Sequence, residues 1–141
     1  MLLKELAAVA APSGFEDKAR EYIKSHAECD EMYTDSIGNL VCRKKGKGKK
    51  VMIAAHMDEV GLIITAITEK GFLKFAPLGG IDSTVLCGQR VFIGNGKIPG
   101  IIGIKAIHLQ ERGEEGKRPK MKELYIDIGA KDKADAQKYV K

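Results

Sequence analysis

The sequence predicts a mixed α and β chain whose character changes near residue 60. Before that point, two stretches repeat apolar residues at helical spacing, and a third is a short, uninterrupted apolar run. After it, the residues are β-branched, punctuated by glycine and nearly free of helical periodicity. We therefore expect an incomplete α/β layer at the start of the chain and a small β-rich domain after it.

Two helices are expected within the first 27 residues. Apolar residues in the segment 2–10 recur at helical spacing, and Pro12 ends that helix. Ser13, with Glu16 three residues later, has the pattern of a capping box and predicts a second helix to about Ala27. The first segment carries both an acid and a base, which favours an amphipathic helix over a signal peptide.

Three strand-like pieces follow, in the stretch EMYTDSIGNLVCRKKGKGKKVMIAAH. A turn at Gly38-Asn39 separates the first two, and a loop rich in lysine and glycine precedes the third, residues 51–55. That last run is apolar without alternation, which is typical of a strand covered on both faces inside an α/β sheet. The helices and strands of this half are too few to cover it, so the layer is expected to be incomplete.

The β-rich half, from Gly61 onward, is expected to form a small closed or half-closed β-barrel. Its short strands are separated by turn signals, at Glu69-Lys70-Gly71 and Asn95-Gly96. A charged loop at 110–120 leads to another strand within 123–130. Asp132 can then cap a final helix over residues 133–141.

Composition places the chain among ordinary globular proteins and disfavours several functional classes. Hydrophobic residues make up 44% of its 141 residues, enough to bury a core. The net charge of +5 is a mild lysine excess without interleaved aromatic residues, so no nucleic-acid partner is expected. No apolar run approaches the roughly 20 residues that span a bilayer. Three widely spaced cysteines without a CxxC pair are typical of reduced thiols, and we expect a cytoplasmic location.

The stretch VMIAAHMDEVGLI places a histidine and an acid at the end of the apolar run. In a strand, residues i and i+2 point to one side, so Asp58 can hold one imidazole nitrogen of His56. That arrangement is common around metal-bound histidines, where the carboxylate orients the ring. The same spacing is also frequent at strand ends that bind no metal, so spacing alone leaves both interpretations open.

The other candidate motifs favour ordinary structural roles. The run KKGKGKK is typical of a solvated loop, and GNGKIPG lacks the following helix that a phosphate-binding loop requires. His108 alternates with apolar residues, which favours a structural or interface role. Spacing supports no Ser/His/Asp or Cys/His catalytic set.

Six segments taken together resemble one known family, in order and with close spacing. They are APSGFE, DSIGNLVCRKKG, VMIAAHMDEVGLI, PLGGIDSTVLCGQRVFIG, GIIGIKAIHL and LYIDIGAKDKADA. The family is that of the cytosolic, di-metal, tetrahedral-type (TET) aminopeptidases, which includes glutamyl and deblocking aminopeptidases, some of them labelled endoglucanases or cellulases. The resemblance covers essentially the whole chain, and it favours the metal-site interpretation of His56.

The resemblance implies a fold, a reaction and two site residues. In the family, an α/β catalytic sandwich is interrupted by an inserted β-barrel domain used in subunit assembly. Residues 1–62 would be the first catalytic segment, and residues 63–141 the β-barrel with its terminal helix. His56 matches a ligand of one of two divalent metals, zinc or cobalt, and Asp58 matches the catalytic-site acid that orients it. The family removes N-terminal residues from peptides with a metal-activated water and a glutamate base.

The family's remaining metal ligands and its general-base glutamate match no residue of this chain. A catalytic zinc needs about three protein ligands, and His56 alone can be assigned. We therefore expect the isolated chain to bind no metal stably and to lack peptidase activity. We also expect homo-oligomers, through the β-barrel domain and through the apolar strand at 51–55. A non-catalytic assembly module with a vestigial metal-site corner is the alternative.

Overall fold

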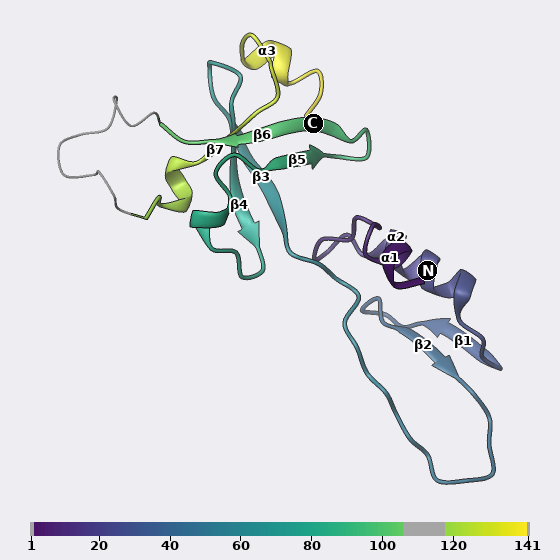
Figure 1. The fold of residues 1–141 in the computed structure, drawn as a ribbon. Helices are drawn as coiled ribbons and strands as arrows, with labels where there is room; N and C mark the ends of the chain where they lie inside the picture. Colours follow the sequence, from purple (N-terminus) through teal and green to yellow (C-terminus); the bar gives the residue numbers. More distant parts are fainter. Residues whose placement is uncertain (1, 106–117, 141) are drawn as a thin grey trace. The chain divides into compact units, whose positions relative to one another are not determined.

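The computed structural model describes residues 2–105 and 118–140. His108 and most of the charged loop at 110–120 lie outside the described residues. The chain divides into two compact units, Met1–Val60 and Gly61–Lys141 (Figure 1). Helices and strands occur together, as the mixed α and β class predicts. The assignment of residues 1–62 to a catalytic domain and 63–141 to an assembly domain stays a prediction.

The first unit begins with two helices that are shorter than predicted. α1 spans Leu2–Leu6 and α2 spans Asp17–His26. The capping-box prediction for Ser13 and Glu16 is wrong, because Glu16 is itself the N-cap of α2 and makes no side-chain cap bond. The Glu16 carboxylate instead accepts a hydrogen bond from Gly14 N at 2.7 Å, outside the helix.

A two-stranded antiparallel hairpin follows the helices. β1 (Glu31–Thr34) pairs with β2 (Leu40–Arg43), and the turn predicted at Gly38-Asn39 lies between them. The Asp35 carboxylate closes this turn by accepting three hydrogen bonds. Its Oδ1 accepts from two backbone N–H groups, at 3.1 and 2.8 Å, and its Oδ2 accepts from Asn39 Nδ2 at 2.9 Å. The hairpin register is therefore fixed by local turn chemistry.

The stability of this hairpin is expected to depend on pH through Asp35. The Asn39 side chain, and then backbone N–H groups, lower the pKa of Asp35 by hydrogen bonding. A lowered carboxyl pKa contributes stability above the unfolded pKa and loses it as the pH falls through the folded one. Below about pH 4, the free energy of unfolding should therefore fall more steeply in the wild type than in Asp35→Asn. Urea titrations across this range measure both slopes, and equal slopes would contradict the prediction.

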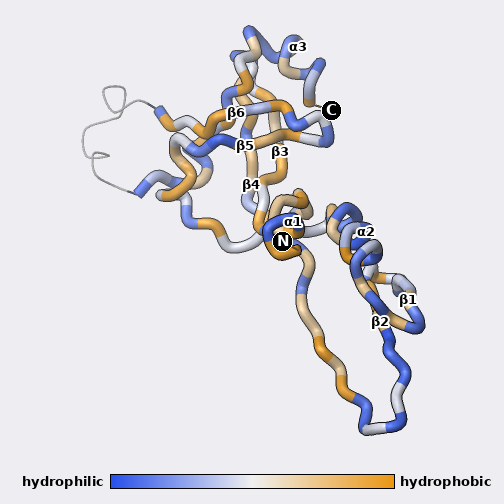
Figure 2. The backbone as a smooth tube through the Cα atoms, turned by 45° about the vertical axis from the view of Figure 1, so that its right-hand side comes forward, coloured by the Kyte–Doolittle hydropathy of each residue, from blue (hydrophilic) through white to orange (hydrophobic). Residues whose placement is uncertain are grey.

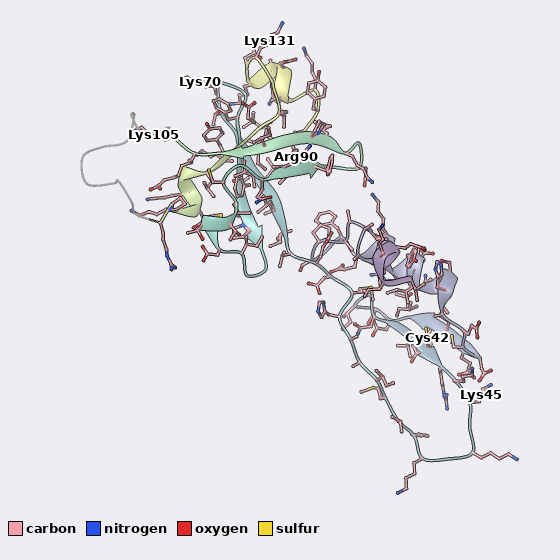
Figure 3. The ribbon with its side chains drawn as sticks, viewed as in Figure 1. Cys42, Lys45, Lys70, Arg90, Lys105 and Lys131 are labelled. Carbon is pink, nitrogen blue, oxygen red and sulfur yellow. The ribbon has the colours of Figure 1, made fainter. Side chains whose placement is uncertain are left out.

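The lysine run leaves β2 as an exposed loop without regular structure, as predicted. Figure 3 labels Cys42 of β2 and Lys45 near the start of this loop. The Lys45 Nζ atom lies 2.8 Å from Glu31 Oε1, an ion pair on the hairpin surface. Such an exposed pair contributes little to stability.

The apolar run at residues 51–55 does not form the predicted strand. It has no ladder partner within residues 2–105 and 118–140. Val51, Met52 and Ile53 are 84%, 89% and 93% exposed, and they form the orange stretch of the long loop in Figure 2. The prediction failed because an apolar run carries no information about its pairing partner, and a strand exists only as part of a hydrogen-bonded sheet.

The second unit is built on a five-stranded antiparallel sheet in the order β3-β4-β7-β6-β5. The strands are β3 (Gly61–Ile67), β4 (Leu73–Leu78), β5 (Arg90–Ile93), β6 (Ile98–Gly103) and β7 (Tyr125–Asp127). The turns predicted at 69–71 and 95–96 lie between β3 and β4 and between β5 and β6. No ladder joins β3 to β5 in the described part of this unit, so the closed or half-closed barrel stays a prediction.

Short helices complete the second unit. Two 3-10 helices, η1 (Ser83–Val85) and η3 (Met121–Glu123), lie in its connections. Asp132 caps α3 as predicted, but α3 spans Lys133–Ala136, so the final helix is shorter than the expected 133–141. Within residues 2–105 and 118–140, no helix is long and apolar enough to cross a membrane.

The core of the second unit is centred on β7. Leu73, Ile102, Leu124 and Ile126 are its largest fully buried side chains. Ile126 of β7 lies opposite Leu73 of β4 on one side and Ile102 of β6 on the other. A Cβ atom on Gly100 would lie 2.6 Å from Ile126 Cγ2, so the close approach of β6 requires glycine there.

Candidate functional site

His56 and Asp58, the two predicted site residues, lie together in the first unit. His56 Nδ1 is 3.0 Å from Asp58 Oδ1 and 3.0 Å from the Asp58 backbone oxygen. A carboxylate and a carbonyl oxygen can only accept, so Nδ1 carries the proton and Nε2 of the neutral ring keeps its lone pair. The His56 side chain is 85% exposed. The pair therefore presents one accessible nitrogen donor.

Ser13 holds the second oxygen of the Asp58 carboxylate. Its Oγ donates a hydrogen bond to Asp58 Oδ2 at 2.5 Å, across 45 residues of sequence. This bond, and after it the one from His56, lower the pKa of Asp58, although partial burial opposes them. Asp58 is therefore ionised at neutral pH, which suits an acceptor for the imidazole proton. Sequence reasoning placed Ser13 at a helix cap and missed this contact.

A β-bridge and two hydrogen bonds join the N-terminal segment to Glu59, the residue next to Asp58. Pro12 and Glu59 form a parallel β-bridge. Glu59 N donates to Ala11 O at 2.9 Å, and Ala11 N donates to Glu59 Oε1 at 3.0 Å. Ala11 is 2% exposed. Glu59 thus anchors the residues after Asp58 to the start of the chain, a role that no motif indicated.

A depression of about 190 Å³ opens beside His56 and Asp58. Arg20 of α2 forms part of its wall and donates from Nε to Gly38 O at 2.8 Å. The Arg20 guanidinium also pairs with Asp17, and its side chain is 14% exposed. The lining of the depression therefore includes both a fixed cation and the Asp58 carboxylate.

The chemistry of His56 and Asp58 can be compared with that of a metal-bound histidine. A neutral imidazole whose Nδ1 proton is held by a carboxylate matches the usual environment of a zinc-bound histidine. The donor chemistry of His56 and Asp58 therefore fits a zinc or cobalt ion. Residues 2–105 and 118–140 contain no group of three or more His, Cys, Asp or Glu side chains that could hold a metal. A zinc ion takes three or four protein ligands, so any ion at His56 needs further ligands.

Comparison with known proteins gives consistent matches to one family of aminopeptidases. The family model for the M42 glutamyl aminopeptidases matches residues 38–141. Lysyl aminopeptidase of Pyrococcus furiosus is 31% identical over 144 aligned residues, covering 96% of this chain and 41% of that protein.

Solved structures that are similar to the chain include two TET peptidases. A TET aminopeptidase from a marine sediment archaeon of the Thaumarchaeota has a TM-score of 0.92 and 34% identity, with 99% of this chain and 41% of that one covered. The TET1 peptidase of Pyrococcus horikoshii, which can assemble into a tetrahedron or a large octahedral shell, has a TM-score of 0.84 and 35% identity, with 99% and 43% covered. The chain thus spans about two fifths of the length of these relatives.

Proposed function

This chain belongs to the M42 glutamyl aminopeptidase family, and from that membership we propose that it forms the N-terminal part of a metal-dependent aminopeptidase. Such an enzyme hydrolyses N-terminal residues from peptides. The observation that carries the metal-dependent reaction is the contact between His56 Nδ1 and Asp58 Oδ1 at 3.0 Å. It commits one ring nitrogen to the carboxylate and leaves the other as a donor for a metal ion.

Each of the two residues has one role in this proposal. His56 is a ligand of one of two divalent metals, zinc or cobalt, through Nε2. Asp58 accepts the Nδ1 proton, keeps the ring in that tautomer and fixes its direction. Metals bound in such a site supply Lewis acidity, which polarises the peptide carbonyl and lowers the pKa of a bound water. The other ligands and the general base are contributed by residues other than those of this chain.

We expect the isolated 141-residue chain to show no aminopeptidase activity with zinc or cobalt. A catalytic zinc has about three protein ligands, and His56 supplies only one of them. A polypeptide that also carries the family's remaining ligands should release nitroaniline from aminoacyl-nitroanilides, and should lose this activity with a chelator. Turnover by the isolated chain that disappears in His56→Ala would contradict the incompleteness. A chelator-resistant longer polypeptide would instead contradict the metal-dependent reaction.

We also propose that the protein forms homo-oligomers. The Pyrococcus horikoshii relative can assemble into a tetrahedron or a large octahedral shell, and this chain has an apolar surface that suits contacts between copies. Phe92 of β5 and Ile101 of β6 are 70% and 53% exposed. The register of β5 with β6 places both on one face at the edge of the sheet, where apolar side chains favour association.

The same edge favours the second candidate function, a non-catalytic assembly module with a vestigial metal-site corner. The two functions differ in metal content. Stoichiometric zinc or cobalt in an oligomer of the longer polypeptide, lost on His56→Ala, supports the aminopeptidase. An oligomer that binds no metal supports the assembly module. A cytoplasmic location is part of the aminopeptidase proposal.

A further inference from the structure

The orientation of the Asp58 carboxylate depends on both of its oxygens. The terminal torsion of an aspartate side chain has a broad, two-fold preference, so the residue's own rotamer does not fix the carboxylate plane. Oδ1 faces His56 Nδ1 at 3.0 Å, and Oδ2 accepts from Ser13 Oγ at 2.5 Å. Held at one oxygen, the carboxylate is free to rotate away from the ring. Held at both, it has one orientation.

Ser13 is itself held in place by the backbone on either side of it. Before it, Pro12 forms the parallel bridge with Glu59. After it, Phe15 N donates to Pro12 O at 2.8 Å, which closes a turn. Gly14 within that turn has φ +87°, a conformation that L side chains rarely adopt. The serine hydroxyl is therefore delivered to Asp58 by a preformed turn.

We propose that Ser13 is a positioning residue of the His56 site, which fixes the Asp58 carboxylate and through it the Nδ1–H tautomer of the imidazole. The functional value of this positioning rests on the proposed function, because the Nδ1–H tautomer is the one that leaves Nε2 available to a metal ion. The alternative role of the Ser13–Asp58 bond is only to hold the N-terminal segment against the residues around Asp58. The two hydrogen bonds between Ala11 and Glu59 already make that connection without the serine hydroxyl.

The tautomer of His56 can be measured directly in the 141-residue chain. Long-range ¹H–¹⁵N NMR spectra, recorded at about pH 8.5, above the range in which imidazoles titrate, distinguish the two ring nitrogens. The wild type should show mainly Nδ1–H. In Ser13→Ala the ratio of Nδ1–H to Nε2–H should fall by about fivefold, the factor that corresponds to one net hydrogen bond. Ser13→Thr keeps the hydroxyl and should restore the wild-type ratio.

His26 serves as the internal control, because its Nδ1 lies 2.8 Å from Tyr22 O on α2. Its tautomer should be the same in all variants. An unchanged His56 ratio in Ser13→Ala would overturn the inference. So would equal shifts in the alanine and threonine variants accompanied by altered His26 signals, because they would indicate a general disturbance of the first unit.

Cobalt titration of the longer polypeptide separates this inference from the proposed function. Cobalt affinity should fall about 10- to 100-fold in Ser13→Ala, the usual cost of removing a residue that orients a metal ligand, and should recover in Ser13→Thr. That result supports both the positioning role of Ser13 and the proposed function. Absence of any His56-dependent cobalt binding would overturn the proposed function. The positioning role of Ser13 would then stand or fall on the tautomer ratio alone.

Discussion

His56→Ala is expected to remove the metal from the completed aminopeptidase and to lower kcat/KM by about 1000-fold or more. The metal supplies several kcal/mol of transition-state stabilisation, and each 1.4 kcal/mol or so corresponds to a factor of ten. In the proposed function His56 binds the metal, and the contact of its Nδ1 with Asp58 leaves Nε2 as the donor nitrogen. Metal analysis of the purified variant, alongside steady-state kinetics with aminoacyl-nitroanilides, tests both losses.

His26→Ala is the matched control, since it removes another exposed imidazole of the first unit. It should leave metal content and kcat/KM unchanged. Stability should change little in His56→Ala, because that side chain is 85% exposed and surface substitutions cost less than about 0.5 kcal/mol. A His56→Ala enzyme that keeps its metal and its activity would exclude the ligand role.

The contact between His56 and Asp58 could be predicted from sequence because it is local. The two residues are only two positions apart, and their side chains meet here although the segment forms no regular strand. Ser13 could not be predicted as the third partner. It is 45 residues away, and the local pattern SGFE equally fits a capping box.

The turns of the fold were also predictable for a local reason. Gly38 and Gly71 have φ of +94° and +82°. Tight turns often need such positive φ values, which glycine adopts readily, so a glycine in the sequence is a local signal for a turn. The sheet order was not predictable, because β7 is only three residues long and enters between β4 and β6 from a distant part of the sequence. Pairing between distant strands depends on the whole core, and the apolar run at 51–55 shows the same limit.

Ile126→Ala is expected to cost about 2–5 kcal/mol of the free energy of unfolding of the second unit. Ile126 is 1% exposed and lies between Leu73 and Ile102. Among the described residues, the pair Leu73–Ile126 is the whole register between β4 and β7. Because domains of this size are stable by about 5–15 kcal/mol, the loss is a large fraction of the total. Urea unfolding monitored on the second unit measures it.

Val85→Ala is the control for this truncation, because Val85 is apolar but 60% exposed. Its effect should stay within about 0.5 kcal/mol. Equal losses from Val85→Ala and Ile126→Ala would contradict the burial argument. Ile126→Val, which removes a single methyl group, should cost about 0.5–1.5 kcal/mol.

The packing around Ile126 can also be tested by adding volume at Gly100 instead of removing it. A Cβ at Gly100 would lie 2.6 Å from Ile126 Cγ2, and 3.1 Å from Ile93 Cδ1. Gly100→Ala alone should therefore overpack the core, at a cost of about 1–3 kcal/mol. In the Ile126→Ala background the nearest conflicting atom, Ile126 Cγ2, is gone, and the added methyl occupies part of the cavity. The double variant should then be less destabilised than the sum of the two single variants, by about 1 kcal/mol. Strict additivity would mean that β6 and β7 do not pack through these two residues.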